Sequence, residues 1–218
     1  MAEEQPLLPS RRGPRRKKPV TYHLRVTIQG IDPPVFRWIE VSSELFLNDL
    51  NEVPGASIGW VNFAAHEFRC GPTFDDPTSE RYVSADAVAH GDAAVAEDQV
   101  RLDELFTTPG DTLYYLYDYA DYWMHHIVLD KILPRTAKTP RTICASGDRD
   151  GPPEGSGGPA NYEYWCRRAD PDDEGESLEY ITPEALINGT EYHQPNLFVI
   201  EEINWYLTRQ FGYGRGPK

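Results

Sequence analysis

Cysteine is scarce in this chain of 218 residues, which contains only Cys70, Cys144 and Cys166. Their number is odd and none lies in a Cys-x-x-Cys arrangement, so we expect neither a disulfide framework nor a zinc ribbon. Long apolar runs are also missing, because polar and apolar side chains alternate after the N-terminal basic residues. The sequence therefore predicts no signal peptide and no membrane span, and we expect a cytoplasmic protein.

Basic residues are outnumbered, with 21 Lys and Arg against 35 Asp and Glu and a formal net charge of −14. Many of the basic residues lie between Arg11 and Lys18, in a Pro-rich segment with little to bury. We interpret residues 1–18 as a disordered basic arm and residues 19–218 as a single domain. Because the domain is acidic, nucleic acid is a partner only through residues 11–18. A solubilising tail is the alternative role for the arm.

What the chain does contain is the period-two alternation that is typical of half-buried strands. The pattern predicts strands over residues 22–29, 35–41, 113–118 and 123–132, with shorter strands at residues 66–69 and 81–83. Residues 113–132 should form a hairpin whose turn lies at residues 119–121. Successive side chains of a strand point to opposite faces, so His125 and His126 cannot both face one site.

Helices are expected mainly in the C-terminal half. Ser42-Ser43-Glu44 is a helix-start signal before an apolar stripe, and Pro54-Gly55 should end or kink that helix. Residues 84–100 should be a mobile loop or short helix, and residues 144–158 are too rich in Gly and Pro for a helix or strand. Further helices are expected at residues 161–168, 182–187 and 198–210. The sequence thus predicts an α+β fold, in which an antiparallel or mixed β-sheet packs with helices.

An ordered series of short motifs runs along most of residues 20–210. The motifs are Leu24-Arg25-Val26, Gly30-Ile31-Asp32-Pro33-Pro34-Val35-Phe36-Arg37, Gly59-Trp60, His66-Glu67-Phe68, Tyr117-Asp118-Tyr119-Ala120-Asp121, Trp123, His125, Ile127, Leu133-Pro134, Cys144, Gly147, Pro152-Pro153-Glu154, Gly157-Gly158-Pro159 and Glu201-Glu202-Ile203-Asn204. This series resembles the plasmid pRiA4b ORF-3-like family, domains of plasmids and chromosomes that include passenger proteins of an insertion element. The resemblance implies a mobile-element origin but no particular reaction.

The chain departs from the family pattern at a few positions. Ala120 stands where the family has Gly, and Gly151 stands where it has Cys before the Pro-Pro-Glu motif. A second cysteine near Cys144 is therefore missing, which weakens the case for a thiolate-rich metal site.

The motifs carry imidazole, carboxylate and thiol groups that together suit a polar site. Two histidines and a carboxylate are typical ligands of zinc, iron or manganese, so a divalent metal ion is a candidate cofactor. The candidate metal ligands are His66, Asp121 and His125, the candidate catalytic acid or base residues are Glu67 and Glu154, and the candidate ligand-binding residues are Asp118, Trp123 and Cys144.

Each of these residues also has a structural interpretation. Asp118 and Asp121 can hydrogen-bond the hairpin turn through its backbone, and Trp123 can belong to the core. Cys144 could be a nucleophile with His125 as its base, but a lone cysteine in a strand is more often a small buried apolar residue. The Gly-rich loop should lie against the hairpin and carry Glu154 toward it.

Two classes of function remain open on the sequence alone. The first is an intracellular interaction module, which binds another protein or a small-molecule ligand at a polar His/Asp/Glu site. The second is a metal-dependent enzyme, hydrolase-like or of other metal-assisted chemistry, in which the residues named above hold the ion and move the proton.

Overall fold

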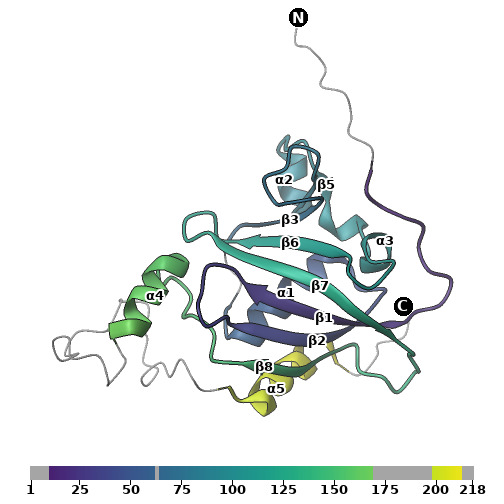
Figure 1. Cartoon of the computed structure of the whole chain (residues 1–218). Helices are drawn as coiled ribbons and strands as arrows, with labels where there is room; N and C mark the ends of the chain where they lie inside the picture. The colour runs from purple at the N-terminus through teal and green to yellow at the C-terminus, as the bar shows by residue number, and fades with distance from the viewer. Residues whose placement is uncertain (1–9, 62–63, 169–197, 213–218) are drawn as a thin grey trace, which may run out of the picture.

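The computed structural model describes residues 10–61, 64–168 and 198–212. Eight strands form one mixed sheet in the order β5-β4-β3-β6-β7-β1-β2-β8 (Figure 1). The strands are β1 (Thr21–Ile28), β2 (Phe36–Ser42), β3 (His66–Cys70), β4 (Glu80–Val83), β5 (Val95–Ala96), β6 (Thr112–Tyr117), β7 (Trp123–Leu133) and β8 (Thr142–Asp148). The helices are α1 (Leu47–Ile58), α2 (Ala85–Ala89), the 3-10 turn η1 (Glu97–Gln99), α3 (Leu102–Leu105), α4 (Gly158–Arg168) and α5 (Ile200–Phe211).

The predicted α+β class is confirmed, and most of the predicted strands are present. All pairings are antiparallel except that of β4 with β5. Residues 84–100 contain the expected short helix α2. The helix predicted at residues 182–187 lies outside the described residues. Within those residues, we find no helix that is both long and apolar enough to cross a membrane.

The sheet has one face that belongs to the core. In β1 the buried residues alternate with half-buried ones, and in β7 His125 is buried while His126 is half-buried, as period two predicts. Helix α5 packs against β8 and α1 on the core side, and Figure 1 shows α1 behind the sheet. The other face carries stacked ring pairs, Tyr114 on His126 and His23 on Trp38, with ring centroids 5.0 and 4.8 Å apart.

The first helix begins later and ends later than the sequence predicts. Ser42 belongs to β2, and the Ser43 hydroxyl accepts a hydrogen bond from the Val20 N–H instead of capping a helix. Helix α1 starts at Leu47 and continues through Pro54 to Ile58. Pro54 thus lies inside the helix, and Gly59, at φ +97°, ends it in the left-handed conformation.

The prediction of a loop from residue 144 is wrong over its first five residues. Residues 142–148 form the edge strand β8, which pairs antiparallel with β2. Gly147 lies opposite Arg37 in this ladder. A Cβ built on Gly147 would lie 2.8 Å from the Cδ of Arg37 and 2.8 Å from the Phe198 ring. Glycine therefore occurs in this strand because close packing requires it, and not because the chain turns there.

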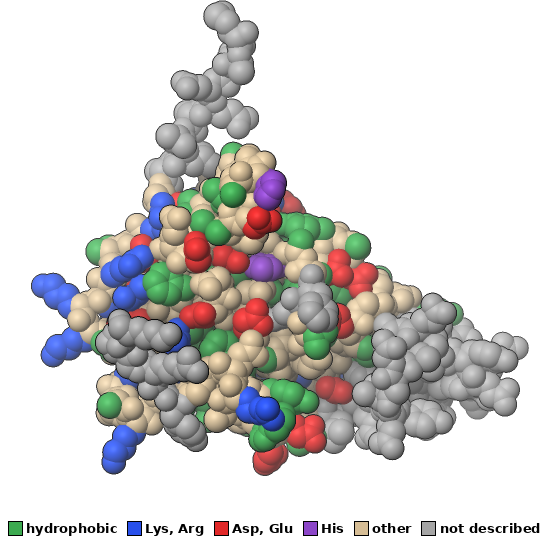
Figure 2. Space-filling model, turned by 180° about the vertical axis from the view of Figure 1, so that it is seen from behind, with side chains coloured by type: hydrophobic (Ala, Val, Ile, Leu, Met, Phe, Trp, Pro, Cys, Tyr) green, Lys and Arg blue, Asp and Glu red, His purple; other side chains and the backbone are tan. Residues whose placement is uncertain are grey.

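Residues of the second half of the basic arm contact the body of the protein. Residues 10–18 lie against the body and pass α3 (Figure 1). The Arg15 Nε lies 3.0 Å from a Glu104 carboxylate oxygen, and the backbone N–H of Arg16 donates to Asp103 at 3.0 Å. Figure 2 shows basic side chains gathered along one edge and carboxylates dispersed over the helix side. Charge complementarity thus fixes this part of the arm on the acidic domain.

Candidate functional site

The tip of the β6–β7 hairpin is held by Asp118 and Asp121. Asp118 adopts a left-handed φ of +57°, and its Oδ1 accepts hydrogen bonds from the backbone N–H groups of Ala120 at 2.9 Å and Asp121 at 3.3 Å. The Asp121 Oδ2 accepts from the Gly157 N–H at 3.0 Å. The Asp118 carboxylate therefore stabilises the backbone of the turn, and the Asp121 carboxylate holds the backbone of the Gly-rich loop.

The Gly-rich loop lies against the hairpin, as the sequence predicts. The Tyr117 hydroxyl donates to Glu154, whose second carboxylate oxygen accepts from the Val61 N–H at 2.9 Å. The indole N–H of Trp60 donates to the Pro152 carbonyl oxygen at 2.7 Å. We call these contacts the loop latch. Glu154 thus connects two segments of chain, which is a structural use of a residue that we expected as an acid or base.

Trp123 and His125 belong to the core beneath this latch. Trp123 is 1% exposed and His125 is fully buried. The Nδ1 of His125 lies 3.0 Å from the Trp123 carbonyl oxygen, and its ring meets the edge of Trp60 at 5.6 Å. Burial lowers the pKa of His125 to about 4. A neutral imidazole in this position contributes packing and does not act as a cation near pH 7.

His66 and Glu67 follow each other in β3 and point to opposite faces. The His66 Nε2 lies 2.9 Å from the Glu97 carboxylate. Burial works against the charge of Glu67, but hydrogen bonds from Arg81 and Arg69 outweigh it and lower the pKa of Glu67. A carboxylate held by two guanidinium groups is a poor general base, because its pKa lies far below neutral pH.

The predicted metal ligands do not converge. His66 pairs with Glu97, Asp121 binds the Gly157 backbone, and His125 is enclosed by aromatic rings. Among the residues that the structure describes, no three His, Cys, Asp or Glu side chains gather in an arrangement that could hold a metal ion. The geometry consequently gives no support to a metal centre built from these three residues.

Cys144 lies in β8, and both its backbone polar groups are bonded to a side chain of α5. The amide of Asn204 accepts from the Cys144 N–H at 2.7 Å and donates to the Cys144 carbonyl oxygen at 2.9 Å. Cys144 is 1% exposed, and burial raises the pKa of its thiol to about 11. A protonated, enclosed thiol fits the small apolar role and not that of a nucleophile.

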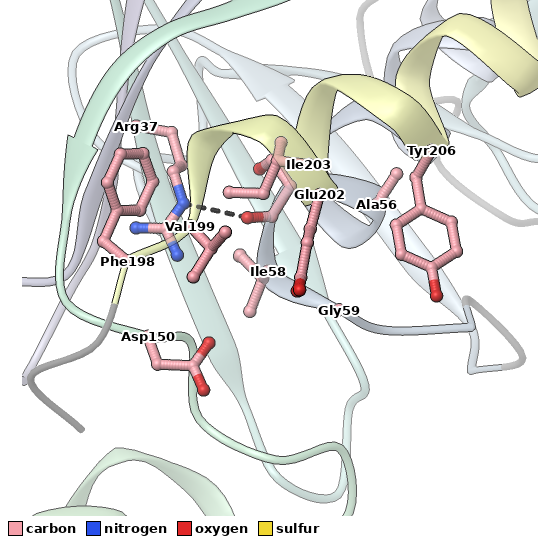
Figure 3. A pocket seen from close by; sticks show the side chains of 11 residues that line it. Arg37, Ala56, Ile58, Gly59, Asp150, Phe198, Val199, Glu202, Ile203 and Tyr206 are labelled. Atoms are coloured by element: carbon pink, nitrogen blue, oxygen red, sulfur yellow. Dashed lines mark hydrogen bonds between the residues drawn. The ribbon is translucent and has the colours of Figure 1, made fainter. Parts of the chain in front are cut away.

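A pocket of about 130 Å³ opens where β2, the end of α1 and the start of α5 meet (Figure 3). Its lining includes Arg37, Ile58, Asp150, Phe198, Glu202 and Ile203. We call it the Arg37 pocket. It lies away from the loop latch and uses none of the residues that we expected as metal ligands or catalytic groups. The described part of the chain therefore has a small cavity at a place that the motif analysis did not select.

Arg37 is an unusual lining residue because arginine side chains are rarely buried, and this residue is only 2% exposed. Its Nε donates to the Ser57 carbonyl oxygen at 2.8 Å, and its Nη1 donates to the carbonyl oxygens of Phe36 at 2.9 Å and Asp148 at 3.0 Å. The guanidinium also lies 4.8 Å from the centroid of the Phe198 ring. Each described hydrogen bond thus ends on a neutral backbone acceptor, so the positive charge is not cancelled by a bonded carboxylate.

The local structure explains how this charge is held in place. Ser57 lies in the last turn of α1, where carbonyl oxygens lack helical partners and the helix dipole favours a cation. Burial lowers the pKa of Arg37, yet a guanidinium stays protonated at neutral pH. Because Gly147 has no side chain, Arg37 and Phe198 can both approach β8 closely.

Sequence reasoning missed this pocket, although its residues occur in the motifs that carry the family resemblance. Arg37, Gly59, Gly147 and the segment 201–204 come from four separate motifs, and all four lie in or beside the pocket. The partners of Arg37 are backbone carbonyl oxygens that only the fold brings together, so no pattern in these motifs marks the pocket.

A family model, one curated protein and one solved structure match this chain. The model of the plasmid pRiA4b ORF-3-like protein family matches residues 20–194. The uncharacterized protein y4hQ of Sinorhizobium fredii is 32% identical over 163 residues, which cover 72% of this chain and 78% of that protein. The crystal structure of the protein of unknown function MM3350 from Methanosarcina mazei Go1 superposes with a TM-score of 0.69 at 28% identity, covering 84% of this chain and 97% of the other.

Proposed function

The chain belongs to the plasmid pRiA4b ORF-3-like family, and we propose that this member is a ligand-binding module whose site is the Arg37 pocket. The observation that carries the proposal is the buried guanidinium beside a cavity, hydrogen-bonded only to backbone carbonyl oxygens. Burying a charge that no bonded carboxylate neutralises is costly, and an anionic group of a ligand would lower that cost.

The proposed ligand is a small organic molecule with a carboxylate. In the described part of the chain, the Nε and Nη1 of Arg37 are used by backbone carbonyl oxygens, and Nη2 is the nitrogen left to donate to a ligand carboxylate. Ile58 and Ile203 supply apolar contacts for the rest of the molecule. A protein partner, which the sequence also left open, remains a prediction. The pocket favours the small ligand because the cavity is small and Arg37, Ser57 and Ile58 of its lining are buried.

The test is a titration with short carboxylates of increasing apolar size, from acetate to isovalerate. Binding is measured by calorimetry and by the shift in the melting temperature of the protein. We expect isovalerate to bind and to raise the melting temperature. Replacing Arg37 removes three hydrogen bonds to the backbone and can unfold the protein, so the diagnostic variant is Ala56→Leu. Ala56 lines the pocket from within α1, and a leucine there occupies the space without touching the charge.

Ala89→Leu is the matched control, since Ala89 is an exposed helical alanine of α2 that does not line the pocket. We expect Ala56→Leu to weaken carboxylate binding at least about tenfold, a loss of about 1.4 kcal/mol, while Ala89→Leu binds like the parent. Equal binding by parent and Ala56→Leu, or no binding to any carboxylate, would overturn the proposal.

A further inference from the structure

Two carboxylates share the Arg37 pocket with the guanidinium. Asp150 follows β8, and Glu202 lies in the first turn of α5. Figure 3 shows Arg37, Asp150 and Glu202 entering the hollow from three different parts of the chain. Glu202 is exposed, and it makes no hydrogen bond or ion pair with another residue in the described ranges. The pocket therefore presents a buried positive group and an accessible negative one.

This mixture of charges restricts the ligand. A simple anion that approaches Arg37 is repelled by Asp150 and Glu202, and a simple cation that approaches Glu202 is repelled by Arg37. A molecule that carries both charges satisfies each group. We infer that the ligand is a small zwitterion of the α-amino acid type, whose carboxylate binds Arg37 and whose ammonium binds Glu202. This inference rests on the proposed function and adds the class of ligand.

The size and the walls of the pocket set the rest of the ligand. Drug-sized ligands occupy pockets of about 300–1,000 Å³, whereas this one measures about 130 Å³. Ile58, Val199 and Ile203 contribute apolar surface. A short branched side chain, such as that of valine, matches both the volume and the walls, while a large aromatic amino acid does not.

Three compounds that share an isopropyl group on the carbon bearing the charged groups separate the effects of the two charges. L-valine carries both, isovalerate lacks the ammonium group, and isobutylamine lacks the carboxylate. We expect calorimetric titration of the full chain to give an affinity for L-valine about tenfold higher than for isovalerate, and no binding of isobutylamine. Glu202→Gln should remove the preference for L-valine over isovalerate, because it removes the charge that faces the ammonium group.

Glu201→Gln is the matched control, since Glu201 is the exposed neighbour of Glu202 on α5 and does not line the pocket. It should retain the preference for L-valine. If L-valine and isovalerate bind the parent equally well, the inference of a zwitterionic ligand is wrong but the proposed carboxylate site stands. If none of the three compounds binds, both the zwitterion and the proposed function are wrong.

Discussion

Arg37 and His125 are both buried nitrogen bases on the core side of the sheet, but they differ in charge. Arg37 is bonded to three carbonyl oxygens and keeps its proton because its intrinsic pKa is so high. The His125 Nδ1 lies 3.0 Å from the Trp123 carbonyl oxygen, a contact that favours the charged ring but is outweighed by burial. Burial alone can therefore neutralise the histidine, and only the arginine offers a charge to a ligand.

His125 should make stability depend on pH in the mildly acidic range. Its pKa is near 6.5 in the unfolded chain and about 4 in the folded protein. Between these values the unfolded chain binds more protons, so stability falls as the pH decreases. We expect the parent to lose about 2 kcal/mol more than His125→Phe between about pH 7 and about pH 5, measured by urea unfolding. Parallel losses in the two proteins would show that His125 is not buried and neutral.

The residue scale also shows what sequence patterns can and cannot predict. The burial of His125 follows from the alternation in its own strand, which is a local property. The role of Arg37 depends on carbonyl oxygens of Ser57 and Asp148, which lie 20 and 111 positions away along the chain. Every residue type has a carbonyl oxygen, so no sequence pattern identifies these partners.

At the scale of elements, the long strands were predictable and the edge strand was not. Strands β1 and β7 have neighbours on both sides and alternate cleanly. Strand β8 contains glycine where Arg37 and Phe198 pack closely, so tertiary contacts outweigh its weak strand propensity. The start of α1 was misplaced because Ser43 bonds the Val20 backbone across the sheet, a contact that a capping signal cannot reveal.

The loop latch should contribute measurably to the position of the Gly-rich loop. Replacing Glu154 with alanine leaves the Tyr117 hydroxyl and the Val61 N–H without their carboxylate acceptor. We expect Glu154→Ala to lower the free energy of unfolding by about 1–3 kcal/mol, and to speed hydrogen exchange at the Val61 amide. A double-mutant cycle with Tyr117→Phe should give a coupling energy of about 1 kcal/mol. Strictly additive effects would contradict a direct bond between the two side chains.

At the scale of the whole molecule, the arm and the body form one electrostatic unit. Arg15 pairs with Glu104, and the Arg16 guanidinium donates to the Tyr22 hydroxyl at 3.0 Å. Basic side chains engaged in this way are less available to nucleic acid than those of a free tail. The sequence showed that the arm is basic and the body acidic, but it could not show that the arm contacts the carboxylates of the body.

The contribution of the arm to stability can be measured by removing two positive charges either from Arg15 and Arg16 or from Lys17 and Lys18. We expect Arg15→Gln/Arg16→Gln to lower the free energy of unfolding by about 1–2 kcal/mol, since exposed pairs are worth about 0.2–1 kcal/mol each and these residues make several contacts. Lys17→Gln/Lys18→Gln should leave it unchanged, because both lysines are exposed. Thermal unfolding at low and high salt measures the effect, which should shrink as salt screens the pairs. An equal effect of the two double variants would mean that net charge, and not the Arg contacts, matters.

The bonds between Asn204 and Cys144 have a consequence for how copies of this protein behave toward each other. An uncovered strand at the border of a sheet can recruit a strand from another molecule and so extend the sheet between chains. At Cys144 the side-chain amide of Asn204 already takes both the donor and the acceptor that such a strand would need. Helix α5 therefore blocks the addition of a strand to β8 at this position.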